Sequence, residues 1–307
     1  MVDFATSLIN DWNVVWKALS IVLVLYLLIP APLILISIMK KKTIEWARIV
    51  SMSVLYMGLF IVIALPPIAL SFFMAAVIFL GGREVYNAAK CKDAENVDSV
   101  ITIYSLLTSS LIPLILFFFP KIFPIYLIIV AIVLFCIPVV TQKTRRALDK
   151  LARALAILLF GTMISFVILI RKMPDGFALT VFLIYLTNLA DTTAFVFGKL
   201  VGKTKLLPLV SPGKTIEGSV LSLVAVFLIA LLFRFFLLPD YSIRAILLLA
   251  IIIGVGSQLG DLILSMFKRD VGIKDYSQII PGHGGILDRF DSLIITPPLF
   301  YYFLRYL

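Results

Sequence analysis

Charged side chains are scarce in this chain. Only 14% of its 307 residues are Asp, Glu, Lys or Arg, whereas 62% are hydrophobic. Because the apolar residues form long uncharged runs, this composition excludes a soluble globular protein and predicts an all-α polytopic integral membrane protein. No segment between the apolar runs is long enough to build a separate soluble domain.

Cysteine and histidine are almost absent. The two cysteines, Cys91 and Cys136, are isolated from each other, so neither a disulfide nor a thiolate metal site is indicated. The single histidine, His283, argues against zinc, which usually takes several nitrogen or sulfur ligands. No internal repeat is visible, so the sequence gives no support to a transporter built from inverted repeats.

Apolar runs of about twenty residues predict about ten membrane-spanning helices. The third of them is short, and Pro297 and Pro298 should bend the last one. We interpret the first run as a retained span because it is too long for a signal peptide. The predicted spans are 18–39, 48–65, 67–81, 100–119, 122–141, 154–170, 177–198, 218–238, 244–266 and 286–306.

Positive charge predicts the orientation of these spans. With ten spans, five basic loops fall on one side, which the positive-inside rule makes cytosolic, and both termini fall on the non-cytosolic side. We therefore expect a multi-pass protein of the inner (plasma) membrane, with residues 1–175 as a lipid-facing scaffold and residues 176–307 as a catalytic region. The formal net charge of +10 then needs no nucleic-acid partner. The five loops hold 20 of the 27 Lys and Arg residues and lie near 40–48, 82–99, 142–153, 199–217 and 267–289.

The last basic loop and the helix before it are unusually polar for this chain. Asp261 lies inside the ninth predicted span, and Ser265 and Lys268 follow at i+4 and i+7. One helix stripe therefore carries a carboxylate, a hydroxyl and an ammonium group. A charged carboxylate in the apolar layer costs about 3 kcal/mol unless it is compensated, so we favour a functional role over a structural ion pair.

Two further acids, Asp288 and Asp291, stand at i and i+3 where the tenth helix is predicted to begin. One of them could serve only as a helix cap, since carboxylates are favoured at helix N-termini. Two acids at the level of Asp261 form a hard-oxygen site of the kind that Mg²⁺ takes together with phosphate oxygens. Nearby, Gly284 and Gly285 either make a flexible turn or let backbone amides approach a phosphate.

A second loop, with the letters SPGKTIEG from residue 211 onward, precedes the eighth predicted span. Hydroxyls, free amides and an ammonium at a helix start suit an anionic phosphate chain, so we assign Ser211, Lys214 and Thr215 to substrate binding. The letters GKT are not a P-loop, because the Gly-x4-Gly-Lys spacing and a preceding strand are missing. Membrane topology is the better explanation for the other lysines of this loop.

Two more polar pairs have competing interpretations. Asn188 and Asp191 share one face of the seventh predicted span, where a polar contact between helices and a ligand-binding role are about equally supported. Arg83 and Glu84 end the third predicted span, and here a topogenic ion pair is the better explanation. Together, the helix ends and loops predict phosphoryl or nucleotidyl transfer to a lipid whose head group lies at the membrane interface.

The polar stretches resemble a known family. The letters SMFKR (265–269), KD (274–275) and PGHGGILDRFD (281–291) resemble the signature of the phosphatidate cytidylyltransferases, also called CDP-diacylglycerol synthases. The block from Asp191 to Gly198 and the letters LLPLVSPGKTIEG (206–218) also resemble that family. The likeness covers about residues 180–307, whereas the first 150 residues are similar only in hydropathy.

This resemblance implies a reaction of CTP with phosphatidate that gives CDP-diacylglycerol and pyrophosphate. It also implies Mg²⁺, alone or with a second cation, held by Asp261 and Asp288. The implied catalytic residues are Asp261, Lys268, Asp288 and Asp291. The candidate substrate-binding residues are Asp191, Ser211, Lys214, Thr215, Ser265, Arg269, Lys274, His283, Gly284, Gly285 and Arg289.

Three alternatives remain at this stage. The same chemistry could act on another lipid phosphate, a lipid kinase would release a nucleoside diphosphate, and a transporter could carry anionic or phosphorylated solutes. Clustering of the acids near one side argues against the transporter, whose sites lie near the bilayer midplane. Membrane lipids are expected partners, and a homodimer is compatible with the sequence, which does not determine the oligomeric state.

Overall fold

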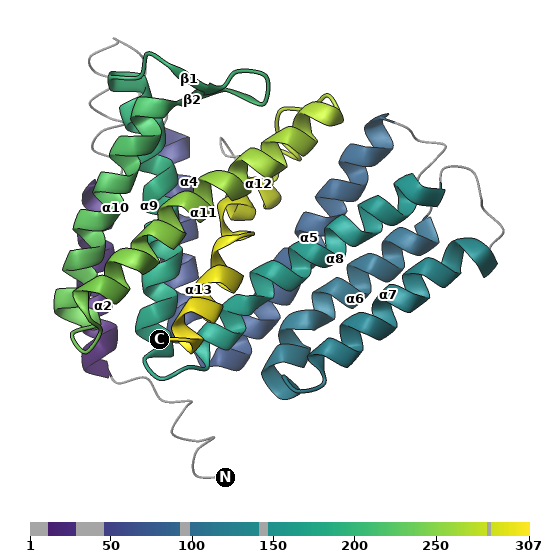
Figure 1. Cartoon of the computed structure of the whole chain (residues 1–307), viewed down its shortest axis with the longest axis horizontal. Helices are drawn as coiled ribbons and strands as arrows, with labels where there is room; N and C mark the ends of the chain where they lie inside the picture. The colour runs from purple at the N-terminus through teal and green to yellow at the C-terminus, as the bar shows by residue number, and fades with distance from the viewer. Residues whose placement is uncertain (1–11, 29–45, 93–98, 141–146, 281–283) are drawn as a thin grey trace.

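The computed structural model describes residues 12–28, 46–92, 99–140, 147–280 and 284–307. Within these ranges the chain is mostly helical, and successive long helices run in alternating directions (Figure 1). The helices are α2 (Trp12–Leu28), α4 (Trp46–Ala64), α5 (Pro67–Lys92), α6 (Ser99–Phe118), α7 (Phe123–Val140), α8 (Ala147–Arg171), α9 (Gly176–Leu200), α10 (Ile216–Leu237), α11 (Ile243–Asp270), α12 (Leu287–Phe290), the 3₁₀ helix η2 (Asp291–Leu293) and α13 (Thr296–Arg305).

Among the described residues, six helices are long and apolar enough to cross a membrane, namely α5, α6, α8, α9, α10 and α11. Three shorter apolar stretches, in α2, α4 and α7, match three other predicted spans. A multi-pass membrane protein is therefore supported. The prediction of a short third span is wrong, since α5 has 26 residues and continues to Lys92.

The tenth predicted span is not one continuous helix. It is divided into α12, η2 and α13, and Pro297 and Pro298 occupy the start of α13. Proline suits the first turn of a helix because its missing N–H would have no partner there. The break brings η2 against α11 at Gly260, where a Cβ atom would lie 2.5 Å from the backbone oxygen of Asp291. A glycine on α11 therefore permits the contact that places Asp291 in the polar region.

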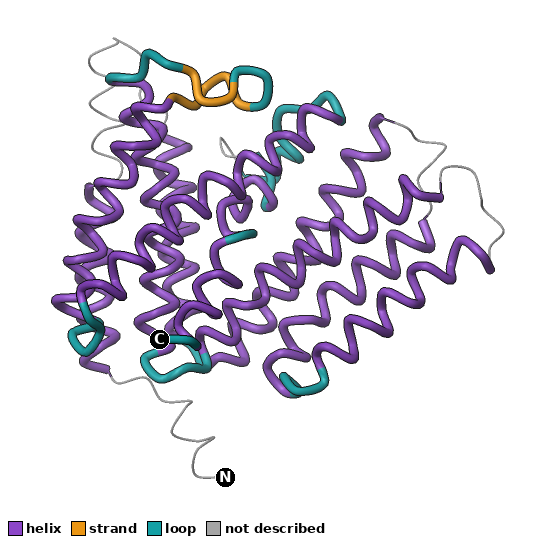
Figure 2. The backbone as a smooth tube through the Cα atoms, viewed as in Figure 1, coloured by secondary structure: helices purple, strands orange, loops and turns teal. Residues whose placement is uncertain are grey.

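The one sheet among the described residues is an antiparallel hairpin of β1 (Lys205–Leu207) and β2 (Ser211–Thr215), drawn in orange in Figure 2. It adds a small β element to the predicted all-α fold. The carboxylate of Glu217 accepts the backbone amides of Lys203 and Thr204 at 3.0–3.2 Å, which ties the base of the hairpin to α10. The hairpin lies at the same end of the bundle as the C-terminal ends of α5, α9 and α11 (Figure 1).

Helix α9 lies inside the bundle and packs against α2, α4, α8, α10, α11 and α13. Its Phe182 side chain is fully buried between Phe233 of α10 and Phe300 of α13. A second apolar cluster joins α6, α7 and α8. Helix α9 carries Asp191 near the hairpin end of the bundle. Because α11 and η2 are among the neighbours of α9, this acid lies next to them.

Two basic residues lie at the opposite end of the bundle, Arg171 as the last residue of α8 and Lys172 directly after it. Arg171 Nε donates to the backbone oxygen of Ile63 at 3.3 Å, and Lys172 Nζ donates to that of Phe117 at 2.6 Å. Both oxygens belong to the last turns of helices, α4 and α6. Cations are favoured at helix C-termini because carbonyl groups there carry partial negative charge. These residues therefore stabilise the scaffold away from the acidic region.

Candidate active site

Asp261 of α11 is held from two directions. Its Oδ2 atom is 2.7 Å from Lys214 Nζ, and Ser265 Oγ donates to its Oδ1 atom at 3.1 Å. Lys214 lies on β2, so this ion pair joins the hairpin to α11. Asp261, Ser265 and Lys268 were predicted to share one helix stripe, and all three lie on α11. Asp261 contacts Ser265, whereas Lys268 contacts a different acid.

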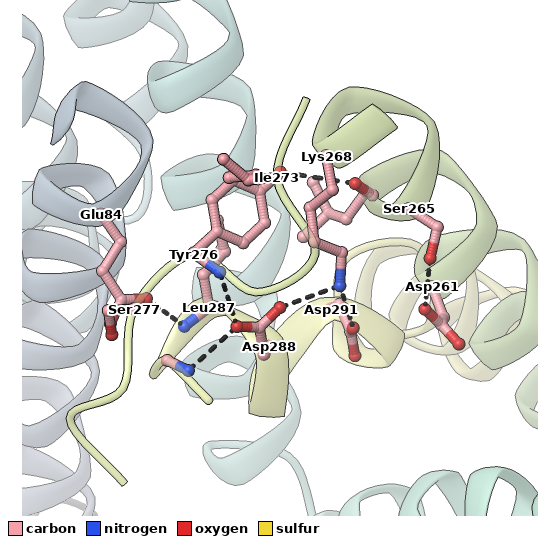
Figure 3. Close-up of polar contacts among 12 residues, drawn as sticks. Glu84, Asp261, Ser265, Lys268, Ile273, Tyr276, Ser277, Leu287, Asp288 and Asp291 are labelled. Carbon is pink, nitrogen blue, oxygen red and sulfur yellow. Dashed lines mark hydrogen bonds and ion pairs between the residues drawn. The ribbon is translucent and has the colours of Figure 1, made fainter. Parts of the chain in front are cut away.

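That acid is Asp288, which is buried at the start of α12. Its Oδ1 atom is 2.8 Å from Lys268 Nζ, and its Oδ2 atom accepts the amides of Tyr276 and Gly285, both at 2.9 Å (Figure 3). Asp288 therefore neutralises a buried ammonium and holds two segments of the preceding loop. The amide of Gly285, which we expected to approach a phosphate, donates to this carboxylate.

Asp291 of η2 lies on the other side of the same ammonium group, with its Oδ2 atom 4.0 Å from Lys268 Nζ. Its Oδ1 atom accepts the amide of Ser292 at 2.8 Å. The Ser292 hydroxyl is within hydrogen-bonding distance of Asp291 Oδ1 and of Asp191 Oδ2 on α9. Lys268 and Ser292 thus link Asp191 of α9, Asp288 of α12 and Asp291 of η2. The structure therefore brings together acids that the sequence predicted at about the same depth in the membrane.

A fourth acid of this region, Glu84 of α5, was not assigned to the site from the sequence. Its carboxylate is buried and accepts the hydroxyl of Ser277 at 2.5 Å and the amides of Ile286 and Leu287 at 2.9 and 2.8 Å. The topogenic interpretation is therefore wrong for Glu84. The available signal was an acid two residues after an apolar run that ends in a glycine pair, but Leu287 lies 203 residues further along the chain.

Tyr276 packs into the same loop. Its ring centroid is 5.7 Å from Lys268 Nζ, and its hydroxyl donates to the backbone oxygen of Leu264 at 3.4 Å. Burial, followed by the nearby charges of Asp288 and Asp291, raises the pKa of the Tyr276 phenol above its ordinary value. The phenol therefore stays protonated and serves as a packing and hydrogen-bonding group.

Other predicted substrate-binding residues border this centre. Ser211 is half-buried at the start of β2, and Thr215 is the N-cap of α10, where its hydroxyl accepts the amide of Gly218 at 3.2 Å. Arg269 donates from Nε to the backbone oxygen of Val210 at 3.2 Å, so it tethers the tip of the hairpin to α11. The hairpin is consequently attached to α11 through both Lys214 and Arg269.

The remaining candidates lie in the loop between α11 and α12 or in α12 itself. Lys274 is exposed, and Gly284 adopts a φ of 80°, which favours glycine. Arg289 has a buried Nε atom without a hydrogen-bond partner among the described residues. His283 lies outside the described residues.

A sequence model of the cytidylyltransferase family matches residues 46–307. The chain belongs to this family. It is 43% identical over 135 residues to the uncharacterized protein YnbB of Escherichia coli (strain K12), covering 44% of this chain and 45% of that protein. It is 43% identical over 136 residues to the phosphatidate cytidylyltransferase of Staphylococcus haemolyticus (strain JCSC1435), covering 44% and 52%. The chain thus spans about half the length of the curated relatives it matches.

Membership in the cytidylyltransferase family implies a nucleotidyltransferase, and it suggests CTP as the substrate. The geometry is consistent with that chemistry, because acids and bases from α9, β2, α11, α12 and η2 meet at one end of the bundle. Three of these elements, α11, α12 and η2, follow one another along the chain.

The acids of the site offer oxygen atoms, which are the donor atoms that Mg²⁺ prefers. Among the described residues, no group of three or more His, Cys, Asp or Glu side chains is arranged to hold a metal ion. Mg²⁺ does not require such a group, since one or two carboxylates commonly bind it together with waters and substrate phosphates. Asp261 and Asp288 offer the hard oxygen atoms that it prefers, and each already stabilises a positive charge, on Lys214 and Lys268. The residues therefore fit a magnesium ion that binds with the nucleotide.

Proposed function

We propose that this chain is a phosphatidate cytidylyltransferase that converts CTP and phosphatidate into CDP-diacylglycerol and pyrophosphate. The observation that carries the proposal is the arrangement of Asp288 and Asp291 around Lys268, together with the Asp261–Lys214 pair, in a chain of the cytidylyltransferase family. The relative from Staphylococcus haemolyticus is named for this activity, and its similarity covers 44% of this chain.

In the proposed reaction, an oxygen of the lipid phosphate attacks the α-phosphorus of CTP. The bond from that phosphorus to the oxygen bridging it to the β-phosphoryl group breaks, and pyrophosphate leaves. A phosphomonoester has a second pKa near 6, so the lipid phosphate is already an anion and needs no strong general base. The barrier lies in bringing two polyanions together and in stabilising the charge of the leaving group.

The basic residues of the site suit this requirement. Lys214 comes from the hairpin and Lys268 from α11, so their ammonium groups lie on two separate elements around the acids. Arg269 continues the basic stretch at the end of α11. We assign these three side chains to the phosphates of CTP and to the leaving pyrophosphate, with Ser211 beside them.

Mg²⁺, alone or with a second cation, belongs to this proposal with Asp261 and Asp288 as ligands. When bound, it would neutralise negative charge on the CTP phosphates. Asp288 Oδ2 already accepts two amides and Oδ1 already pairs with Lys268 Nζ, so a cation at Asp288 would share Oδ1 with that ammonium group. Asp291 supports the site through Lys268 and Ser292.

We further propose that the hairpin end of the bundle faces the cytosol. The described basic residues of 199–217 and of the end of α11 lie at that end, and positive charge favours the cytosolic side. Large apolar side chains are exposed along α10 and α11, including Val224, Leu228, Val255 and Leu259, and these suit contact with lipid tails. A lipid head group at the interface would then meet the acids and lysines directly.

The test uses purified protein in detergent with phosphatidate, Mg²⁺ and CTP labelled at the α-phosphate. We expect label in the lipid product and release of unlabelled pyrophosphate, with both lost in Asp288→Asn and after chelation. Asp240→Asn is the matched control, because Asp240 is exposed in the loop between α10 and α11, at the opposite end from the hairpin. Transfer only to a different lipid phosphate would replace phosphatidate as the substrate, and release of CDP would indicate a kinase. Absence of transfer to every lipid phosphate would refute the proposal.

A further inference from the structure

The loop before α12 has two arms that lie side by side, and two carboxylates connect them. Asp288 accepts one amide from each arm, those of Tyr276 and Gly285. Glu84 also bridges the arms, since it accepts the hydroxyl of Ser277 and the amides of the two residues after Gly285. Figure 3 shows Glu84 approaching the loop from α5 on the side away from Asp261.

The contact between Glu84 and the loop requires the glycine at position 285. A Cβ atom built on Gly285 would lie 2.5 Å from Glu84 Oε2 and 2.7 Å from Glu84 Oε1. These separations are shorter than any ordinary contact, so a larger residue would push the carboxylate away. The absence of a side chain at Gly285 and the presence of an acid at Glu84 are therefore two parts of one contact.

Glu84 differs from the other acids of the region in the kind of partner it has. The hydrogen bonds of its carboxylate within the described residues are with the loop, through one hydroxyl and two amides. Asp261 and Asp288, by contrast, each contact a lysine ammonium. Burying a carboxylate is costly unless it is well hydrogen-bonded. Hydrogen bonds to a charged acceptor are also stronger and geometrically more specific than neutral ones. The arrangement thus gives a precise position to the loop.

We propose that Glu84 is a positioning residue for the nucleotidyl-transfer site, which acts by fixing the start of α12. This inference rests on the proposed function. The position of α12 determines where Asp288 meets Lys268, and η2 follows α12 directly, so Asp291 depends on it as well. A displacement of about 1 Å in a catalytic group can lower a rate about 100-fold. Helix α5 precedes the C-terminal polar stretches by many residues in the sequence, yet its Glu84 contacts them. The first half of the chain therefore contributes directly to the geometry of the site.

The first variant is Glu84→Gln, which keeps the size of the side chain but replaces one acceptor oxygen by an NH₂ group. We expect kcat for cytidylyl transfer to fall about 100-fold. The KM for CTP should change less than about twofold, because Lys214 and Ser211 on the hairpin are untouched. Hydrogen exchange should rise at least about tenfold in peptides covering 276–290, and it should stay unchanged in peptides from the hairpin.

The matched control is Arg83→Gln, because Arg83 is the neighbour of Glu84 on α5 but is exposed. It should leave kcat and the exchange of the loop unchanged. A second variant, Gly285→Ala, attacks the same contact from the other side. It should reproduce the loss of kcat and the faster exchange, and the double variant should be no worse than either single variant, since both remove one interaction.

Three results would overturn the positioning role. One is a Glu84→Gln protein with unchanged kcat and slow exchange in the loop. Another is a drop in activity that accompanies a general loss of thermal stability, with faster exchange in the hairpin as well. Additive losses in the double variant would also contradict a shared contact. A wild-type protein that transfers no label would instead refute the proposed function, while the exchange data would still decide whether Glu84 holds the loop.

Discussion

Lys214 of the β hairpin and Asp261 of α11 form an ion pair in which Nζ and Oδ2 are 2.7 Å apart. The pair connects the two polar stretches of the sequence, one on each side of α10. Its side chains are 17% and 24% exposed, although the Lys214 Nζ atom is itself buried against Asp261. A nucleotide that arrives with a cation would meet an ammonium for its phosphates and a carboxylate for the cation at the same place.

Lys214→Gln should therefore impair the use of CTP. The side chain keeps its polar end but loses the positive charge, and we expect kcat/KM for CTP to fall about 100-fold, as for loss of a group that stabilises transition-state charge. Steady-state rates of label transfer at varied CTP measure the effect. Lys205→Gln is the control, because Lys205 lies on the same hairpin and is exposed. Equal losses in both variants would contradict a specific role for Lys214.

Lys268→Met should destabilise the protein itself. Lys268 is buried between Asp288 and Asp291, at 2.8 and 4.0 Å, so its removal leaves two buried carboxylates without their ammonium. Breaking a buried pair by removing one partner costs about 3–5 kcal/mol. Thermal unfolding in detergent would reveal the loss, and Lys274→Met, an exposed lysine of the following loop, should have little effect. An unchanged unfolding midpoint in Lys268→Met would contradict the buried pair.

Much of the fold follows from hydropathy. Helices α6 and α8–α11 coincide with predicted spans because the apolar runs are long and end at charged residues or prolines, whereas α5 extends well beyond its predicted span. The division of the tenth span was not predicted, although Asp288, Arg289, Asp291 and Ser292 interrupt its apolar residues before and within η2. The break depends on Pro297 and Pro298 and on the contact of Asp291 with Gly260, which is a tertiary feature. The short hairpin was missed because the letters SPGKT contain proline and glycine and lack the alternation of a strand.

The candidate site was predictable where its residues share one helix or one loop. Spacing along α11 was sufficient to place Asp261 and Ser265 on one helix stripe, and the structure adds the hydrogen bond between them. The pairing of Lys268 with Asp288 depends on how the chain returns after α11, and the role of Glu84 depends on a helix from the other half of the chain. Such contacts between distant segments leave no periodic pattern in a single sequence, so only the structure reveals them.

Lys172→Met should lower stability without lowering activity. Lys172 Nζ donates to the backbone oxygen of Phe117 at 2.6 Å at the end of the bundle away from the hairpin. Hydrogen bonds from charged groups contribute about 1.5–3 kcal/mol, so the free energy of unfolding should fall by about that amount. Thermal unfolding and label transfer, measured on the same preparation, would separate the two effects. Lys121→Met, an exposed lysine in the turn after α6, is the control. A selective loss of kcat in Lys172→Met would contradict a purely structural role.

Asp261→Asn should raise the Mg²⁺ concentration that gives the half-maximal rate. The amide keeps the size of the side chain but offers a cation only one neutral oxygen, so we expect an increase of about tenfold or more, together with a lower kcat. Rates of label transfer at varied Mg²⁺ and saturating CTP measure it, with Asp240→Asn as the unaffected control. A lower kcat with an unchanged Mg²⁺ dependence would mean that Asp261 serves the reaction by holding Lys214, 2.7 Å away, and that the cation has other ligands.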